Sequence, residues 1–237
     1  NDSFLPTDHS WEKIQNPNYI REVAFQAVST LLEQHPDVER IGITGQMHGI
    51  VYLDDKGNSV SPLYTWQDGR GDQSYTDGKS YAAYLSELTG YSLATGFGMV
   101  THFYNLKNDL IPESASVFST IHDYIAMLLA GNTVPVTDAS DAASLGVFQI
   151  EQGCFDKAAL EKAGIETAIL PIVAEEACIG NYQGKIPVYV AIGDNQASFL
   201  GSVRPGKEEI LINMGTGGQV SLLSDRILTG EDIETRP

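Results

Sequence analysis

The fold is decided by the stretch Val188-Tyr189-Val190-Ala191-Ile192-Gly193-Asp194-Asn195-Gln196. Its first five residues are apolar and rich in β-branched side chains, which predicts a buried strand. The strand ends at Gly193, and residues 197–201 are typical of a short helix that ends in glycine. A carboxylate between a buried strand and a helix lies where open α/β sheets bind their ligands. Asp194 is therefore the first candidate for a functional residue.

Two roles are open to Asp194. A carboxylate at the positive end of a helix dipole is favoured in its ionised form, and it can take a proton from a hydroxyl within hydrogen-bond reach. The alternative role is structural, because Asp before a helix is commonly an N-cap. The residue alone does not decide between a general base and a cap.

A strand–turn–strand element follows in the sequence. Strands are predicted over residues 209–214 and 219–223, and the turn between them contains Gly215, Thr216 and Gly217. Such a turn exposes backbone N–H groups and one hydroxyl, which suit a phosphate group. A candidate base and a candidate phosphate cradle this close in sequence point to phosphoryl transfer to a hydroxyl.

The composition excludes several classes of protein. The 237 residues are 42% hydrophobic and 19% charged, enough to build a large core in one large or two small domains. Acidic residues outnumber basic ones by 31 to 14, and the net charge of −17 argues against binding to nucleic acid or to an anionic membrane. No apolar run approaches the roughly twenty residues of a membrane span, and no signal peptide is visible, so we expect a cytoplasmic protein. Cys154 and Cys178 are expected to be buried free thiols rather than a disulfide.

The remaining hydrophobic pattern alternates between helix and strand. Helices are predicted over residues 17–34, 81–88, 100–107, 121–129 and 156–162. Strands are predicted over residues 41–46, 50–53, 62–66 and 145–150, with the second returning along the first as a hairpin. Residues 1–16 are expected to be an exposed lead-in, and residues 170–184 a loop. The predicted fold class is α/β with a mixed sheet.

Polar side chains also follow the strand predicted at residues 41–46. Gln46, Met47 and His48 bring an amide, a thioether and an imidazole there, and Gly49 lets the chain turn. Amide and imidazole groups can both hydrogen-bond sugar hydroxyls. The alternative is a hairpin turn whose polar residues face water.

A second polar group ends the strand predicted at residues 62–66. Trp66 offers an aromatic face to the C–H groups of a sugar, and Asp68 and Arg70 add opposite charges. The alternative is a buried Trp beside a surface ion pair, which would contribute little. Three strand ends with such groups are a stronger indication of a site than any one of them.

Five motifs together resemble the FGGY carbohydrate kinases. They are found at residues 43–49, 65–70, 137–140, 193–197 and 215–217, in the order of the family. The Gln-Met-His-Gly form of the first motif is similar to the ketose kinases within that family. The resemblance implies a ribonuclease H-like, actin-type ATPase fold, with a mixed sheet flanked by helices.

The resemblance also implies an activity. It implies ATP-dependent phosphorylation, with Mg²⁺, of a terminal hydroxyl of a ketose, with Asp194 as the general base. Sedoheptulose is the expected ketose and xylulose is the alternative. The implied partners are a small-molecule ketose and ATP, with neither nucleic acid nor membrane, while the oligomeric state stays open and a homodimer is one option.

The site residues follow from the positions that match the family motifs. The implied sugar-binding residues are Gln46, Met47, His48, Trp66, Asp68, Arg70 and Asn195. The implied nucleotide-binding residues are Gly215, Thr216 and Gly217, and no metal ligand is implied in this chain. Residues 1–237 are expected to form a single N-terminal, sugar-binding domain that lacks its first strands and the C-terminal nucleotide domain. The alternative of another class is a sugar-binding fragment without catalysis.

Overall fold

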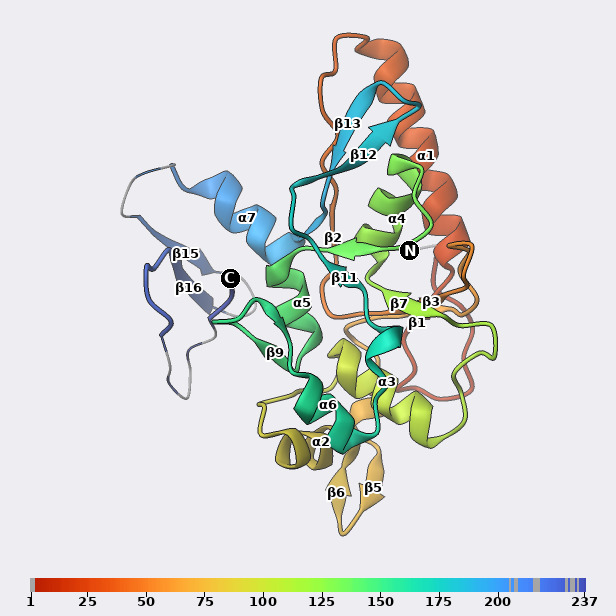
Figure 1. The fold of residues 1–237 in the computed structure, drawn as a ribbon, viewed down its shortest axis with the longest axis vertical. Coiled ribbons are helices and arrows are strands. Elements are labelled where there is room, and N and C mark those ends of the chain that lie inside the picture. Colours follow the sequence, from red (N-terminus) through yellow and green to blue (C-terminus); the bar gives the residue numbers. More distant parts are fainter. Residues whose placement is uncertain are drawn as a thin grey trace.

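The computed structural model describes residues 3–204, 206, 209–214, 218–228, 230, 233 and 235–237. This part of the chain has a mixed α/β fold in which helices lie against short paired strands (Figure 1). The α-helices are α1 (Pro17–Gln34), α2 (Tyr81–Thr89), α3 (Gly98–Lys107), α4 (Ile121–Ala130), α5 (Ala139–Leu145), α6 (Lys157–Ala163) and α7 (Asp194–Ser202), and the 3-10 helices are η1 (Gly69–Asp72) and η2 (Thr167–Ile169).

The strands are short and pair two by two. They are β1 (Ile14–Gln15), β2 (Thr44–Gly45), β3 (Val51–Leu53), β4 (Leu63–Tyr64), β5 (Ser74–Thr76), β6 (Lys79–Ser80), β7 (Val117–Ser119), β8 (Val136–Thr137), β9 (Phe148–Gln149), β10 (Cys154–Phe155), β11 (Ile172–Val173), β12 (Cys178–Tyr182), β13 (Ile186–Tyr189), β14 (Ile192–Gly193), β15 (Ile210–Met214) and β16 (Gly218–Leu222). The pairs are β1–β4, β3–β7, β5–β6, β9–β10, β12–β13 and β15–β16, all antiparallel, and β2–β14 and β8–β11, both parallel.

The parallel pair of β2 and β14 positions the candidate site. Ile192 lies opposite Thr44, and Gly193 lies opposite Gly45. An isolated parallel bridge between Ile41 and Val188 extends the pairing toward the start of both segments. Because the two strands run in the same direction, the residues that follow Gly45 and Gly193 leave the sheet at the same edge.

The predicted hairpin between residues 41–46 and 50–53 is wrong. β3 does not return along β2 but pairs with β7, where Tyr52 lies opposite Phe118. His48, with φ of 69°, takes the left-handed conformation that redirects the chain after β2. All three residues of β3 are buried, so the strand requires cover on both faces, which elements distant in sequence provide.

Residues 4, 6–10 and 13 are exposed as their polarity predicts, but residues 3–16 are not a free lead-in. β1 pairs with β4, and Gln15 is buried with its amide donating to the Ser3 hydroxyl at 3.0 Å. Gly69 donates its backbone N–H to the carbonyl of Trp11 at 2.8 Å. The first segment is therefore part of the folded body and covers the loop after β4.

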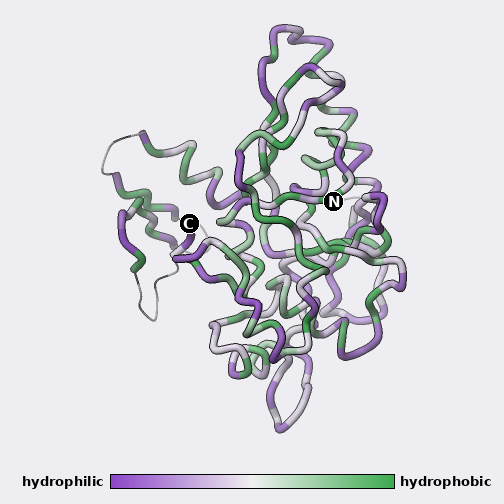
Figure 2. Tube along the Cα trace, viewed as in Figure 1, coloured by the Kyte–Doolittle hydropathy of each residue, from purple (hydrophilic) through white to green (hydrophobic). Residues whose placement is uncertain are grey.

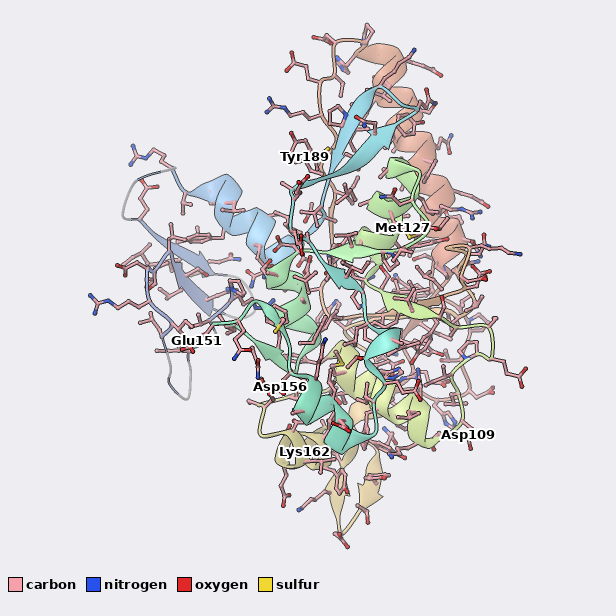
Figure 3. The ribbon with its side chains drawn as sticks, viewed as in Figure 1. Asp109, Met127, Glu151, Asp156, Lys162 and Tyr189 are labelled. Carbon is pink, nitrogen blue, oxygen red and sulfur yellow. The ribbon has the colours of Figure 1, made fainter. Side chains whose placement is uncertain are left out.

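Two hydrophobic cores hold the helices in place. The first core is built around Phe103, Phe118 and Leu145, with helices α2, α3, α5 and α6 contributing. The second core is built around α4, whose Met127 is buried in it, together with Val188 from β13 (Figure 3). The predicted helix at residues 17–34 is confirmed as α1, which packs one apolar stripe on the second core.

Other predicted elements shift in length. Residues 139–145 form α5, a helix that was not predicted, so the strand expected at residues 145–150 shrinks to β9. The predicted loop at residues 170–184 contains β11 and β12. Both cysteines are free thiols as predicted, but neither is fully buried, since Cys154 is half-buried and Cys178 is exposed.

The segment after α7 exposes apolar side chains. It projects from the body with β15 and β16, and Figure 2 shows hydrophobic stretches within it. Met214 is 85% exposed, and Ile212 and Val220 are each more than half exposed. Among the described helices, none combines the length and apolar character that crossing a bilayer requires.

Candidate active site

Asp194 is the first residue of α7, and it does not act as the N-cap. The N-cap position is held by Gly193, and no side chain makes a cap hydrogen bond there. The Asp194 side chain is exposed at the positive end of the helix. The cap interpretation is therefore wrong, and the carboxylate can be reached by a ligand.

Met47 is packed directly against the strand end that precedes Asp194. Met47 is buried, and a Cβ added at Gly193 would lie 2.4 Å from its Cγ atom. Any larger residue at position 193 would collide with Met47. The structure thus brings residues 46–48 and Asp194, which are predicted site residues distant in sequence, to adjoining strand ends.

The His48 imidazole is held by two neighbours. Its Nδ1 lies 2.6 Å from the carbonyl oxygen of Ser144, and its ring stacks on Phe97 with 4.5 Å between centroids. A carbonyl only accepts, so Nδ1 carries the proton and donates it. The Gln46 side-chain amide donates a hydrogen bond to the Gln15 side chain at 2.8 Å.

Trp66 and Asn195 are both exposed. Trp66 is 51% exposed, and its backbone carbonyl is approached by Gly96, where an added Cβ would lie 2.0 Å from the oxygen. Asn195 accepts a hydrogen bond from Gln219 of β16 at 3.2 Å. Trp66 is therefore not the buried residue of the alternative interpretation, and its ring is available for contact.

Asp68 and Arg70 are buried and bound to each other. Arg70 Nε donates to Asp68 Oδ1 at 2.6 Å, and the second carboxylate oxygen accepts from the backbone N–H of Lys13 at 3.0 Å. The guanidinium also donates to Asn105 and lies 4.0 Å from the centre of the Tyr64 ring. The pair is thus not on the surface, as the alternative interpretation expects, and its side chains are occupied within the protein.

The network of hydrogen bonds that includes Arg70 continues from Asn105 into the core. Its amide donates to the Tyr52 hydroxyl at 3.3 Å, and that hydroxyl lies 2.9 Å from His102 Nδ1. Burial raises the pKa of Tyr52 above its ordinary value and lowers the pKa of His102 to about 4. Both groups are therefore neutral near pH 7.

A buried cluster of His122, Asp123 and Asp141 lies behind β2, and the sequence did not indicate it. His122 Nε2 lies 2.8 Å from Asp141 Oδ2, and all three side chains are buried. Burial raises the pKa of Asp123, which also accepts a hydrogen bond from Thr120 at 2.8 Å. The available signal was His-Asp inside an otherwise apolar helix, because charged residues are seldom buried without a partner.

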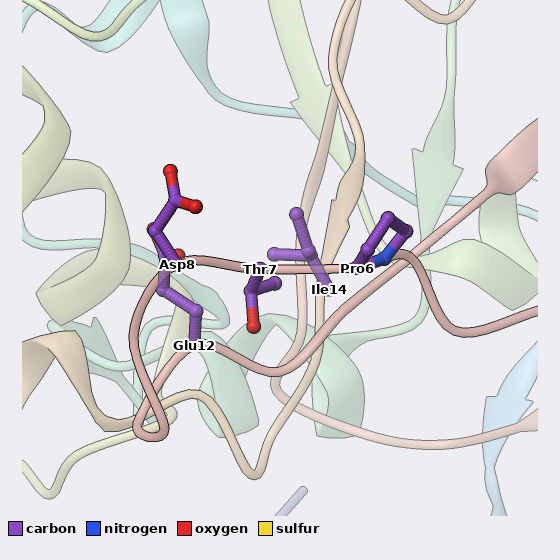
Figure 4. A pocket seen from close by; sticks show the side chains of 5 residues that line it. All are labelled: Pro6, Thr7, Asp8, Glu12 and Ile14. Atoms are coloured by element: carbon purple, nitrogen blue, oxygen red, sulfur yellow. The ribbon is translucent and has the colours of Figure 1, made fainter.

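Two further features give little support to the candidate site. Gly215, Thr216 and Gly217 lie outside the described residues, while the strands predicted on either side are confirmed as β15 and β16, with Met214 opposite Gly218. A pocket of about 300 Å³ in the N-terminal segment contains none of the predicted site residues (Figure 4). It is lined by Pro6, Thr7, Asp8, Glu12 and Ile14.

The described residues do not make a magnesium site by themselves. Mg²⁺ takes six oxygen ligands, usually one or two carboxylates with phosphate and water. Of the predicted site residues at the ends of β2 and β14, only Asp194 is a carboxylate, and its neighbours are amides, a thioether and an imidazole. His122, Asp123 and Asp141 are buried and have ligand-type atoms within 4.8 Å of one another. His122 is hydrogen-bonded to Asp141, while His122 Nδ1, Asp123 Oδ1 and Asp141 Oδ1 have no hydrogen-bond partner among the described residues. An imidazole is not a ligand that Mg²⁺ prefers.

Known proteins are similar to this chain in sequence. The chain is 32% identical to mouse (Mus musculus) sedoheptulokinase over 215 residues, which are 80% of this chain and 44% of the mouse protein. It is 27% identical to the xylulose kinase of Staphylococcus xylosus over 220 residues, 86% of this chain and 45% of that protein. The chain therefore spans less than half the length of these curated relatives.

Solved structures agree on the fold. The crystal structure of ligand-bound xylulose kinase from Lactobacillus acidophilus has a TM-score of 0.73 at 19% identity, and the match covers 91% of this chain and 47% of that one. The xylulose kinase from Rhodospirillum rubrum has a TM-score of 0.72 at 21% identity, covering 92% and 48%. These neighbours have the actin-like ATPase fold that the motifs imply. Residues 5–201 match the N-terminal domain of the FGGY carbohydrate kinases, and the chain belongs to this family.

Proposed function

We propose that the chain is the sugar-binding part of an ATP-dependent ketose kinase, with Asp194 as the general base. One observation carries the proposal. The pairing of Gly193 with Gly45 brings the exposed Asp194 carboxylate to the same sheet edge as residues 46–48. A base beside hydrogen-bonding groups is the arrangement needed to bind and deprotonate a sugar hydroxyl.

The reaction assigns a distinct task to each group. Asp194 takes the proton of the sugar hydroxyl. The hydroxyl oxygen bonds to the γ-phosphorus of ATP, and the bond between that phosphorus and the leaving oxygen of ADP breaks. Gln46, His48, Asn195 and the exposed face of Trp66 orient the sugar. Catalysis of this kind depends mostly on positioning and on neutralising phosphate charge. Mg²⁺ accompanying the nucleotide would supply that neutralisation, and the role proposed for Gly215, Thr216 and Gly217 is to bind the phosphates.

Asp68 and Arg70 take an indirect part in this proposal. Because their side chains are buried and paired, they support the loop that carries Trp66. Direct contact with the sugar would need one of them to leave the pair. The sugar-site role that the motif implies for them is thus retained only as support of Trp66.

Sedoheptulose is the substrate we propose first. The support is the resemblance of the Gln-Met-His-Gly motif to the ketose kinases and the 32% identity to a protein named sedoheptulokinase. Xylulose is the second candidate, because xylulose kinases are also among the relatives. A sugar-binding fragment without catalysis is the alternative of another class.

A paired measurement tests the proposal. The full-length protein that contains this chain, incubated with ATP and Mg²⁺, is expected to release ADP with sedoheptulose, and more slowly with xylulose and glycerol, in a coupled assay. Absence of ADP release with every ketose and polyol of a broad panel would contradict the kinase assignment.

The 237-residue chain alone is expected to behave differently. Its sugar site lies open to water, so each hydroxyl contact nets only about 0.5–1.5 kcal/mol. We expect ketose binding on the order of millimolar by calorimetry and no ATP-dependent phosphorylation. Full turnover by the isolated chain would contradict the division of the site between two domains.

A further inference from the structure

Gln219 reaches from β16 to the residue next to the candidate base. Its Nε2 amide lies 3.2 Å from Asn195 Oδ1 and 3.1 Å from Ser221 Oγ. An amide NH₂ group has two N–H donors, so Gln219 can donate to both oxygens at once. Asn195 directly follows Asp194 in α7. The hydrogen bond therefore ties β16 to the end of the helix that carries the candidate base (Figure 1).

The two faces of the β15–β16 pair differ in polarity. Directly opposite residues of an antiparallel pair share a face, and successive residues alternate between faces. One face is apolar and at least half exposed, and it carries Ile210, Ile212, Met214, Val220 and Leu222. On the other face Asn213 lies opposite Gln219, and Leu211 lies opposite Ser221. The contact with Asn195 shows that this second, more polar face is the one turned to α7.

The hydrogen bond fixes which end of the Asn195 carboxamide is open to a ligand. A side-chain amide has an oxygen that accepts and an amino group that donates. The two ends are similar in size, so without a fixed partner either end can face a ligand. Because Oδ1 of the exposed Asn195 accepts from Gln219, the Nδ2 amino group is the end that remains open. It offers N–H donors, which match an oxygen atom of a ligand.

We propose that Gln219 is a positioning residue for Asn195. By donating to Oδ1, it holds the carboxamide so that the Nδ2 amino group is the end presented to an oxygen atom of the sugar. Gln219 thus acts on sugar affinity through Asn195 and leaves proton acceptance by Asp194 unchanged. The role toward the sugar rests on the proposed function, whereas the contact between the two amides is a property of the chain itself.

The contact is tested by NMR of the side-chain amide groups in the 237-residue chain. The NH₂ signals of Gln219 are identified as those missing from Gln219→Met. Asn195→Ala removes the acceptor and is expected to move one of these proton signals upfield, whereas Asn195→Asp keeps an acceptor oxygen and is expected to hold it downfield. Ser198→Ala, at an exposed position of α7, is the control and should leave both signals unchanged. Equal Gln219 signals in the wild-type protein and Asn195→Ala would overturn the inference.

The effect on the sugar is tested by calorimetric titration of the full-length protein with sedoheptulose and with xylulose. Gln219→Met keeps the length of the side chain but cannot donate, and it is expected to raise the Kd for the ketose about fivefold. The Kd for ATP is expected to stay unchanged. Gln152→Met, at an exposed glutamine between β9 and β10, is the matched control and should bind the ketose as the wild-type protein does.

A double-mutant cycle separates positioning from a general structural defect. If Gln219 acts through Asn195, Gln219→Met is expected to cause no further loss of ketose affinity once Asn195→Ala is present. Two losses that add in full would overturn the inference, because a structural defect at β16 would weaken binding whether or not Asn195 is there.

The two proposals can fail separately. If the full-length protein binds a ketose and follows the cycle but releases no ADP, the kinase function fails and the role of Gln219 stands. If ADP is released while Gln219→Met binds the ketose as tightly as the wild-type protein, the role of Gln219 fails and the kinase function stands.

Discussion

The Arg70 guanidinium and the Asp68 carboxylate form a buried ion pair with 2.6 Å between Nε and Oδ1. The same carboxylate accepts the backbone N–H of Lys13. The pair therefore joins the loop after β4 to the N-terminal segment, two parts of the chain that no pattern in the sequence connects. Its burial determines what happens when one partner is removed.

Replacing Arg70 by Met is expected to lower the free energy of unfolding by about 3–5 kcal/mol, because Asp68 is left as an uncompensated buried charge. Urea denaturation measures the change. The control is Arg226→Gln, which removes an exposed arginine and is expected to change the same quantity by less than about 0.5 kcal/mol. Lost sugar binding at full stability would show that Arg70 contacts the ligand instead.

Replacing Gly96 by Ala is expected to destabilise the protein and to disturb Trp66. Gly96 has φ of 89°, and an added Cβ would lie 2.0 Å from the Trp66 carbonyl oxygen, so backbone must move. The matched control is Gly131→Ala, where φ is 78° but the space is open, and a cost of only about 1 kcal/mol is expected. Urea denaturation and tryptophan fluorescence report the two effects. Equal costs at both positions would contradict the steric argument.

Replacing His102 by Asn is expected to change how stability depends on pH. Between the ordinary pKa of about 6.5 and the folded value of about 4, the unfolded chain binds a proton that the folded chain does not. This residue therefore removes about 1.4 kcal/mol of stability per unit as pH falls through that window. Asn can keep a partner for the Tyr52 hydroxyl, which lies 2.9 Å from His102 Nδ1.

The variant should accordingly lose less stability than the wild-type protein between pH 6.5 and pH 4. The variant is compared with the wild-type protein because Asp123 has a raised pKa, which makes its contribution to stability change with pH in the opposite direction to that of His102. That contribution is common to both proteins and cancels in the difference. Parallel stability curves from urea denaturation at each pH would mean that His102 is already protonated in the folded state.

Replacing Asp194 by Asn in the full-length protein is expected to lower turnover by roughly 10² to 10⁴ and to change sugar affinity little, because the amide cannot take a proton. A coupled ADP assay and sugar titration measure the two quantities. Ser198→Ala, at an exposed position on the same helix, is the control and should keep normal turnover. Near-normal turnover of Asp194→Asn would exclude the base assignment.

Local patterns in the sequence were sufficient for most helices. The apolar stripe of residues 17–34 and the glycines at positions 90 and 131 predicted α1 and the ends of α2 and α4, because periodicity and capping involve residues within a few positions of one another. The strand end before Asp194 was predicted for the same reason. That Asp194 and residues 46–48 lie at one sheet edge was decided by the parallel pairing of β2 with β14, which the sequence did not predict.

Only the tertiary structure decided which polar residues are buried and which strands pair. β3 prefers β7 to its neighbour β2, and Asp68, Arg70 and His122 are enclosed by segments far away in the chain. Residue type alone does not predict whether a polar side chain is buried, since an acid–base pair is equally compatible with a solvated surface and with a buried network. The sequence by itself thus determined where the candidate base stands on its strand. The packing of α4 and α5 behind β2 decided that His122, Asp123 and Asp141 are buried together, because burial depends on the whole set of neighbours that folding brings together.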